Sequence, residues 1–139
     1  AEPPHLRLLG GVLAVAGHNW PVFLGFKGGK GVATSAGMLL GLAPAACAVA
    51  LAAWIVVLLL GRYVSLASIT AALVIGVAVW FEPFRPAAAG TGCLTPAVLS
   101  LMALLVALRH RGNIARLRAG SEPRFSFRRG NPPRGDGAA

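Results

Sequence analysis

Residues 31–61 read GVATSAGMLLGLAPAACAVALAAWIVVLLLG and contain no Asp, Glu, Lys or Arg. An uncharged stretch of this length can cross about 30 Å of hydrocarbon at roughly 1.5 Å per helical residue. Pro44 interrupts the stretch, because proline lacks a backbone N–H and its ring clashes with the preceding helical turn. The stretch therefore predicts two helices, one over residues 32–42 and one over residues 45–60.

Two further uncharged windows, residues 63–81 and 86–108, are also long enough to span a bilayer. A short apolar helix over residues 6–16 precedes them and is expected to end near Gly17. The helix over residues 32–42 would be only about 16 Å long, which suits a half-helix packed inside protein. We expect an all-α fold, a polytopic transmembrane helix bundle with a short, broken half-helix after a glycine-rich loop.

The positions of the basic residues predict how these spans are oriented. If Pro44 marks a hairpin, then Lys27, Lys30, Arg62 and the arginine-rich C-terminus share one membrane face, which the positive-inside rule makes cytoplasmic. A single bent crossing would instead put the lysines and the C-terminal arginines on opposite faces. The hairpin is therefore expected, with the polar motifs and the C-terminus in the cytoplasm.

The composition excludes an ordinary soluble domain, since 56% of the residues are apolar and the mean hydropathy is +0.71. The formal charge of +9 is uneven, because most of the basic residues lie from Arg109 onward. A basic cluster directly after an apolar span is typical of a cytoplasmic anchor, so we expect no nucleic-acid partner. Residues 1–125 are expected to form the membrane domain, and residues 126–139 a disordered basic tail.

The loop FKGGKG, residues 26–31, opens the helix that begins at Val32. Glycine lacks a Cβ, so successive N–H groups can converge on an anion, and the helix N-terminus and lysines add positive charge. It is not a Walker A loop, because Gly25 lies one residue too close and Gly31 replaces the magnesium-binding Ser or Thr. An alternative is a flexible loop whose lysines meet lipid headgroups. The phosphate-binding candidates are Lys27, Gly28, Gly29, Lys30 and Gly31.

Polar residues elsewhere are expected at the same face. His18 precedes the loop, and an ionisable side chain inside a membrane protein is a functional candidate. His110 and Asn113 become i and i+3 neighbours if the last span continues helically through them, so both can meet one polar ligand. Ser65 lies near the same face and can join them. Glu122 is otherwise expected in a solvated ion pair with a neighbouring arginine.

Three stretches carry a family resemblance: GHNWPVFLGFKGGKGVAT at residues 17–34, RYVSLAS at residues 62–68, and RHRGNIARLRAGSEPRF at residues 109–125. Together they closely resemble the bacterial PlsY-type glycerol-3-phosphate acyltransferases, over about residues 6–124. The resemblance implies a membrane enzyme of phospholipid biosynthesis, located in the bacterial inner membrane. It would transfer a fatty acyl group from acyl phosphate, rather than acyl-CoA, to the 1-hydroxyl of glycerol 3-phosphate. The products would be lysophosphatidic acid and inorganic phosphate.

The resemblance also implies roles for single residues. Loop residues 27–31, followed by Thr34, would bind substrate phosphate, and Ser65 matches the family's serine. His110, Asn113 and Glu122 would place glycerol 3-phosphate and order the site. We take His18, His110 and Asn113 as catalytic candidates, and the base stays open between the two histidines and a phosphate oxygen of the substrate. An enzyme that supplies acyl phosphate would act upstream.

The sequence departs from the family pattern in two places. The first motif, a Ser-Gly-Asn-rich loop that ends in arginine, does not appear, and we expect it to precede Ala1 together with two spans. Gly112 stands where relatives commonly carry a charged residue. The change at Gly112 is a mild one, at a position expected to face solvent.

A competing hypothesis is an anion transporter or channel segment that uses the glycine-lysine loop as its phosphate site. Such a protein needs access from both membrane faces, whereas the predicted topology gathers the polar motifs on one. No cofactor and no metal are expected, because Cys47 and Cys93 lack metal-site spacing and no carboxylate cluster is present.

Overall fold

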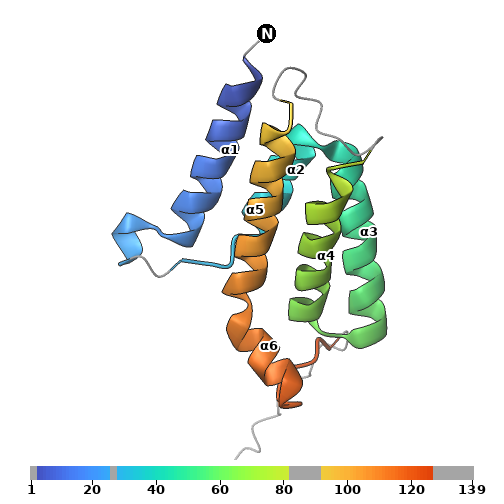
Figure 1. Ribbon diagram of the computed structural model, residues 1–139. Coiled ribbons are helices and arrows are strands. Elements are labelled where there is room, and N and C mark those ends of the chain that lie inside the picture. Colours follow the sequence, from blue (N-terminus) through green and yellow to red (C-terminus); the bar gives the residue numbers. More distant parts are fainter. Residues whose placement is uncertain (1–2, 26–27, 82–91, 127–139) are drawn as a thin grey trace, which may run out of the picture.

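The computed structural model describes residues 3–25, 28–81 and 92–126. The regular elements of these residues are helices, which confirms the expected all-α fold. Figure 1 shows α1 to α5 running alternately down and up, with α6 below α5. The elements are α1 (Pro4–Asn19), the 3-10 turn η1 (Val22–Leu24), α2 (Val32–Leu42), α3 (Pro44–Gly61), α4 (Val64–Ala78), α5 (Leu94–Arg109) and α6 (Arg111–Arg118).

The break between α2 and α3 lies where the sequence predicts it. Helix α2 ends at Leu42, and Pro44 is the first residue of α3, a position where its missing N–H would be unsatisfied in any case. Among the described residues, α3 is long and apolar enough to cross a membrane by itself. The bent pair of α5 and α6 is a second candidate if it is counted as one span, and α2 and α4 are shorter apolar helices.

Helix α1 is longer than predicted. It continues through Gly17 and His18 and ends at Asn19. Pro21 explains this endpoint, because proline disfavours the helical conformation in the residue before it, and Trp20 has left the helix. His18 and Asn19 therefore lie on the last turn of a helix instead of in the loop that follows.

The last span does not continue as one helix through Asn113, so the condition under which His110 and Asn113 would be i and i+3 neighbours on one helix is not met. Helix α5 ends at Arg109, α6 begins at Arg111, and their axes differ by 52°. The break has a local cause at His110, whose Nδ1 lies 2.8 Å from the Val106 carbonyl oxygen. A helical backbone would use that oxygen for the His110 N–H, which instead donates to Ala107 at 3.0 Å.

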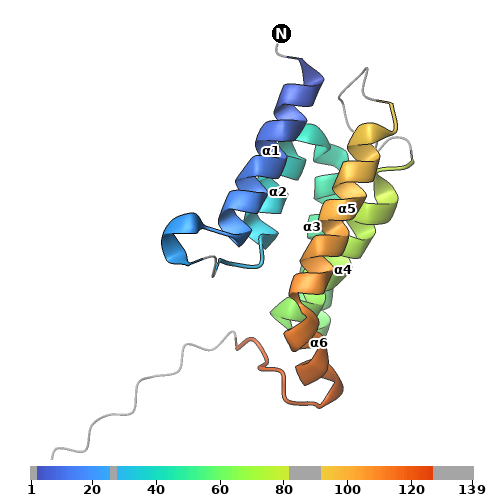
Figure 2. The same ribbon diagram turned by 60° about the vertical axis from the view of Figure 1, so that its left-hand side comes forward.

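The apolar core lies between the helices and away from the connection that precedes α2. Small residues on α3, such as Ala46 and Ala50, allow close helix contacts and are almost fully buried. Figure 2 shows α1 and α2 as a pair beside the group formed by α3, α4 and α5. Many large apolar side chains point outward, among them Leu60 with 83% of its surface exposed. Outward apolar side chains on helices suit contact with lipid.

Three polar segments lie toward one end of the bundle; Figure 1 draws two of them at the bottom and the third, which leads into α2, above them beside α5. They are the connection before α2, the turn between α3 and α4, and α6 with the residues that follow it. The chain after α6 folds back onto the turn, where the Phe125 N–H donates to the Arg62 carbonyl at 2.6 Å and Arg124 Nε donates to the Tyr63 hydroxyl at 3.0 Å. The predicted clustering of polar motifs at one end is confirmed. Residues 82–91 and the tail beyond Ser126 lie outside the described residues.

Candidate functional site

The glycine-rich loop rests directly on the end of α1. Gly31, the residue before α2, has a left-handed φ of 74°, which favours glycine. A Cβ at Gly31 would lie 2.7 Å from Asn19 Oδ1, a Cβ at Gly28 would collide with the His18 carbonyl oxygen, and a Cβ at Gly29 would collide with the His18 ring. A side chain is therefore blocked by backbone at Gly28 and by the buried Asn19 amide at Gly31, whereas at Gly29 it would meet the tip of the exposed His18 ring. Lys27, also predicted to bind phosphate, lies outside the described residues.

Lys30 is tied to the C-terminal motif through a chain of hydrogen bonds. Its Nζ donates to Asn113 Oδ1 at 2.7 Å, and Asn113 Nδ2 donates to Glu122 Oε1 at 2.7 Å. The Ser65 hydroxyl donates to the same carboxylate oxygen at 2.6 Å. The loop, α4, α6 and the residues after α6 thus meet in one polar network. Asn113 and Ser65 are buried within it, whereas Lys30 is exposed.

Glu122 is the acceptor on which this network converges. Hydrogen bonds from Ser65 and Asn113, with a further contribution from the Arg116 guanidinium, hold the pKa of Glu122 at about 2. Arg116 Nε donates to Glu122 Oε2 at 2.7 Å. The side chain is therefore ionised near neutral pH and is held by donors from the chain itself. The predicted ion pair with a neighbouring arginine is confirmed, with Arg116 as the partner.

His110 is buried at the junction of α5 and α6, with 2% of its surface exposed. Because Nδ1 faces the Val106 carbonyl oxygen at 2.8 Å, Nδ1 carries the proton in that hydrogen bond. Nε2 is then the ring nitrogen with a lone pair, and it can accept a proton. The ring lines a cavity that Lys30 also lines, so the arrangement brings a potential base and a cation to one opening.

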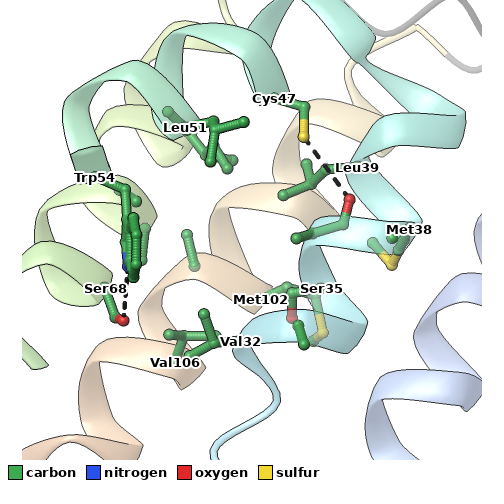
Figure 3. A pocket seen from close by; sticks show the side chains of 18 of the residues that line it. Val32, Ser35, Met38, Leu39, Cys47, Leu51, Trp54, Ser68, Met102 and Val106 are labelled. Carbon is green, nitrogen blue, oxygen red and sulfur yellow. Dashed lines mark hydrogen bonds between the residues drawn. The ribbon is translucent and has the colours of Figure 1, made fainter. Parts of the chain in front are cut away.

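This cavity has a volume of about 660 Å³ and lies among α2, α3, α4 and α5. Figure 3 shows its apolar wall, with Leu39 and Met38 on α2, Leu51 and Trp54 on α3, and Met102 and Val106 on α5. Trp54 Nε1 donates to the Ser68 hydroxyl at 3.2 Å on one side of the cavity. Along α5 and the residue that follows it, the lining residues run from Leu99 to His110, a rise of about 16 Å. The cavity is thus an elongated apolar space with its polar residues near one end.

A second cavity, of about 290 Å³, lies on the other side of Lys30. Its walls are the backbone and side chains of Gly28, Gly29, Lys30, Leu108, Arg109 and Arg111. Three cationic residues, Lys30, Arg109 and Arg111, give this cavity a positive charge that suits an anion such as phosphate. Lys30 lines both cavities and therefore stands between an apolar space and a cationic one.

Residues 4–120 match the family model described as glycerol-3-phosphate acyltransferase. The chain belongs to the glycerol-3-phosphate acyltransferase family. Similar curated proteins include glycerol-3-phosphate acyltransferases of Desulforudis audaxviator, 48% identical over 126 residues, and of Salinibacter ruber, 47% identical over 125 residues. These alignments cover 91% and 87% of this chain but 60% and 52% of the relatives. The chain thus spans somewhat more than half the length of the curated relatives that it matches.

Solved structures give the same result. The chain resembles the crystal structure of PlsY (YgiH), an integral membrane glycerol 3-phosphate acyltransferase, in its glycerol 3-phosphate form, with a TM-score of 0.71 and 40% sequence identity. The lysophosphatidic acid form of that protein gives a TM-score of 0.70 and 39% identity. These matches cover 84% and 83% of this chain and 55% of the solved one. The similarity to an integral membrane protein confirms that this is a membrane protein of the predicted family.

The structure brings most of the predicted site residues together. Lys30, Ser65, Asn113 and Glu122 form one network, and His110 joins Lys30 at the apolar cavity. His18 lies on the other side of the loop, exposed, with its ring against Gly29. Thr34 is half-buried in the first turn of α2 and lines neither of the two cavities described above. The individual roles of these residues in the acyltransferase remain predictions.

Two residues beside the loop were not predicted. Asn19 is fully buried, and neither of its amide atoms has a hydrogen-bond partner within the described residues. Arg109 donates to backbone carbonyls of Asn19 and Gly29, yet its position in a basic run indicates only a membrane anchor. The available signal for Arg109 was its place directly before His110 in the third motif. A sequence signal was also available for Asn19, because an asparagine between apolar segments is rare.

Proposed function

We propose that this chain forms the phosphate-binding and acyl-binding part of an enzyme that transfers a fatty acyl group from acyl phosphate to glycerol 3-phosphate. The products are lysophosphatidic acid and inorganic phosphate. The observation that carries the proposal is the position of Lys30 between an elongated apolar cavity and a cationic one. One substrate has an apolar chain and a phosphate, and the other is a small phosphorylated polyol, so the pair of cavities matches the pair of substrates.

In this mechanism the acyl chain occupies the apolar cavity, with its phosphate toward Lys30 and the glycine-rich loop. Loop N–H groups and the lysine ammonium stabilise the negative charge that grows on phosphate as it leaves. The 1-hydroxyl oxygen of glycerol 3-phosphate attacks the carbonyl carbon, a carbon–oxygen ester bond forms, and the anhydride carbon–oxygen bond breaks. Because acyl phosphate is already activated, orientation and charge stabilisation supply most of the catalysis.

The hydroxyl proton must leave during this attack. His110 is suited to accept it through Nε2, because Nδ1 is engaged by the Val106 carbonyl oxygen. A phosphate oxygen of the substrate is the second candidate, and it needs no protein group. His18 is supported less well, since its ring contacts Gly29 on the side of the loop that faces α1. The pH dependence of the acyl-transfer rate in a His110→Gln variant separates the first two candidates. If a substrate phosphate oxygen accepts the proton, the variant keeps the pH dependence of wild type; if His110 accepts it, the variant loses the titration of that group.

The membrane arrangement follows from the same polar end. We propose a multi-pass protein of the bacterial inner membrane, with the loop, the turn at Arg62 and α6 facing the cytoplasm. The basic residues of that end, which include Lys30, Arg62 and Arg116, support this orientation. Glycerol 3-phosphate then reaches the site from water, while the acyl chain enters from the bilayer. A reaction that makes mixed anhydrides of fatty acids and phosphate must supply the donor.

The test is acyl transfer from palmitoyl phosphate to labelled glycerol 3-phosphate in membranes that contain this chain, with palmitoyl-CoA in parallel. The assay is run with and without a co-expressed N-terminal half of a curated relative. We expect lysophosphatidic acid from acyl phosphate only, abolished by Lys30→Ala and retained by Arg118→Ala, an exposed cation on α6. Absence of product in both preparations, with the chain inserted, rejects the proposal. Labelled phosphate uptake into vesicles would then favour the anion transporter, for which the comparisons offer no support.

A further inference from the structure

Arg109, the last residue of α5, contacts three separate parts of the phosphate site. Its terminal nitrogen donates to the Gly29 carbonyl oxygen at 2.8 Å and to the Asn19 carbonyl oxygen at 3.0 Å. Its guanidinium carbon also lies 5.4 Å from the centre of the Trp20 ring, within the range of a cation–π interaction. One side chain therefore joins α5, the end of α1 and the glycine-rich loop.

The contact with Gly29 has a consequence for the orientation of the loop. A trans peptide unit is planar, and its C=O and N–H point in opposite directions. When Arg109 holds the Gly29 carbonyl, the N–H of Lys30 must point away from that guanidinium. A glycine-rich loop can bind an anion only when its N–H groups, and not its C=O groups, face the ligand. Arg109 therefore fixes the polarity of the peptide unit that leads into Lys30.

The contact with Asn19 acts on the surface that supports the loop. The Asn19 carbonyl belongs to the last turn of α1, where carbonyl groups lack helical partners and a cation is favourable. Gly28 and Gly31 pack against this same turn so closely that a Cβ on either would collide with it. By binding both Asn19 and Gly29, Arg109 makes the helix end and the loop one unit. Movement of one of them without the other breaks a charge-assisted hydrogen bond.

We propose that Arg109 is a positioning residue for phosphate binding in the acyl-transfer reaction, a role that rests on the proposed function. It turns the Gly29 carbonyl outward and locks the loop to α1, so that the loop N–H groups and Lys30 face the phosphate of the substrate. It positions the loop through these contacts, in addition to the positive charge that it contributes to the wall of the cationic cavity. Loss of Arg109 should loosen the loop while the remaining helices keep their structure.

The experiment compares wild type, Arg109→Gln and Arg109→Lys with Arg118→Gln, which removes the same charge from an exposed position on α6. Two quantities are measured on the purified chain in nanodiscs: hydrogen exchange of the amides at residues 28–31 without ligand, and binding of labelled palmitoyl phosphate, the substrate whose phosphate is proposed to lie on the loop. We expect Arg109→Gln to speed loop exchange and to weaken binding about tenfold, the effect of losing one charge-assisted contact. Arg109→Lys should recover only part of both, because an ammonium lacks the flat guanidinium that lies over Trp20. Arg118→Gln should match wild type.

Other outcomes overturn the inference. If the loop amides of Arg109→Gln exchange as slowly as those of wild type, Arg109 does not position the loop. If Arg109→Lys equals wild type in both exchange and binding, a positive charge is enough and the shape of the guanidinium is not needed. Faster exchange in α3 and α4 as well would make Arg109 a residue of general stability. The exchange measurement needs no substrate. If the wild-type chain transfers no acyl group, the proposed function is rejected. Hydrogen exchange of the loop amides still tests whether Arg109 holds the loop in place.

Discussion

The hydrogen bond between Lys30 and Asn113 links the glycine-rich loop to α6, and it can be isolated by a double-mutant cycle. Lys30→Met removes the ammonium but keeps most of the aliphatic stem, and Asn113→Ala removes the acceptor. Asn113→Ala also removes a donor to Glu122, a loss that occurs with or without Lys30. That loss cancels in the cycle, so the coupling that remains belongs to the contact between Lys30 and Asn113.

The size of this coupling follows from the geometry. The Nζ to Oδ1 distance of 2.7 Å is that of a strong charge-assisted hydrogen bond, and such bonds contribute about 1.5–3 kcal/mol. Lys30 is exposed while Asn113 is buried, so solvent screening places the value near the lower limit, about 1.5 kcal/mol. In a chain of 139 residues each kcal/mol changes Tm by roughly 3–5 °C. The expected coupling is therefore about 5 °C.

The assay is thermal unfolding of wild type, the two single variants and the double variant in one detergent. The double variant should lose about 5 °C less than the sum of the two single losses. A matched pair, Lys30→Met with Ser100→Ala, should be additive, because the Ser100 hydroxyl donates to the Gly76 carbonyl oxygen and accepts from Trp80 Nε1, and neither partner belongs to the network. Additive losses for Lys30 and Asn113 would show that the contact contributes nothing to stability. The network would then not hold Lys30 in place.

Three further predictions concern the loop, the carboxylate and the apolar cavity. Gly28→Ala should weaken binding of palmitoyl phosphate about tenfold or more, because its Cβ would collide with the backbone carbonyl oxygens of His18 and Asn19, whereas Gly17→Ala, which meets nothing within 4 Å, should bind normally in the same titration. The pKa of Glu122 is about 2 in the folded chain and 4.5 in a free carboxyl group, so its ionised carboxylate stabilises the folded state fully above pH 4.5. This stabilisation is lost progressively as the pH falls toward 2. Tm scans between pH 6 and pH 3 should show this loss in wild type and a shallower one in Glu122→Gln; parallel curves would contradict it. Ser68→Ala should cost about 1–2 kcal/mol of unfolding free energy by leaving the Trp54 N–H unpaired, with a changed indole emission, and an unchanged Tm and spectrum would place that N–H in contact with water.

The local features of the fold were predictable from sequence because each has a local cause. Pro44 marks the start of α3, Gly31 marks the start of α2, and the uncharged windows mark the apolar helices. The gathering of polar segments at one end followed from counting crossings, since successive antiparallel helices return the chain to the same face. These inferences need only neighbouring residues and the direction of the chain.

What the sequence did not predict depends on contacts between distant residues. Arg109 and Gly29 are 80 positions apart, and no local pattern distinguishes an arginine that binds carbonyls from one that meets lipid headgroups. The bend at His110 was missed for a related reason, because a histidine that takes over the Val106 carbonyl has no signature in a helical sequence. The ion-pair partner of Glu122 was foreseen only as an arginine, because several lie nearby.

The charges of the network explain why an amide stands at position 113. Asn113 orients the Lys30 ammonium through a carbonyl oxygen, which carries a partial charge and leaves the full positive charge of Lys30 for a substrate anion. An aspartate there would form an ion pair with Lys30 and compete with phosphate. The carboxylate that fixes Asn113 is Glu122, one hydrogen bond further along the network from Lys30, and Arg116 balances its charge. The network therefore holds Lys30 firmly without neutralising it, as the proposed phosphate-binding role requires.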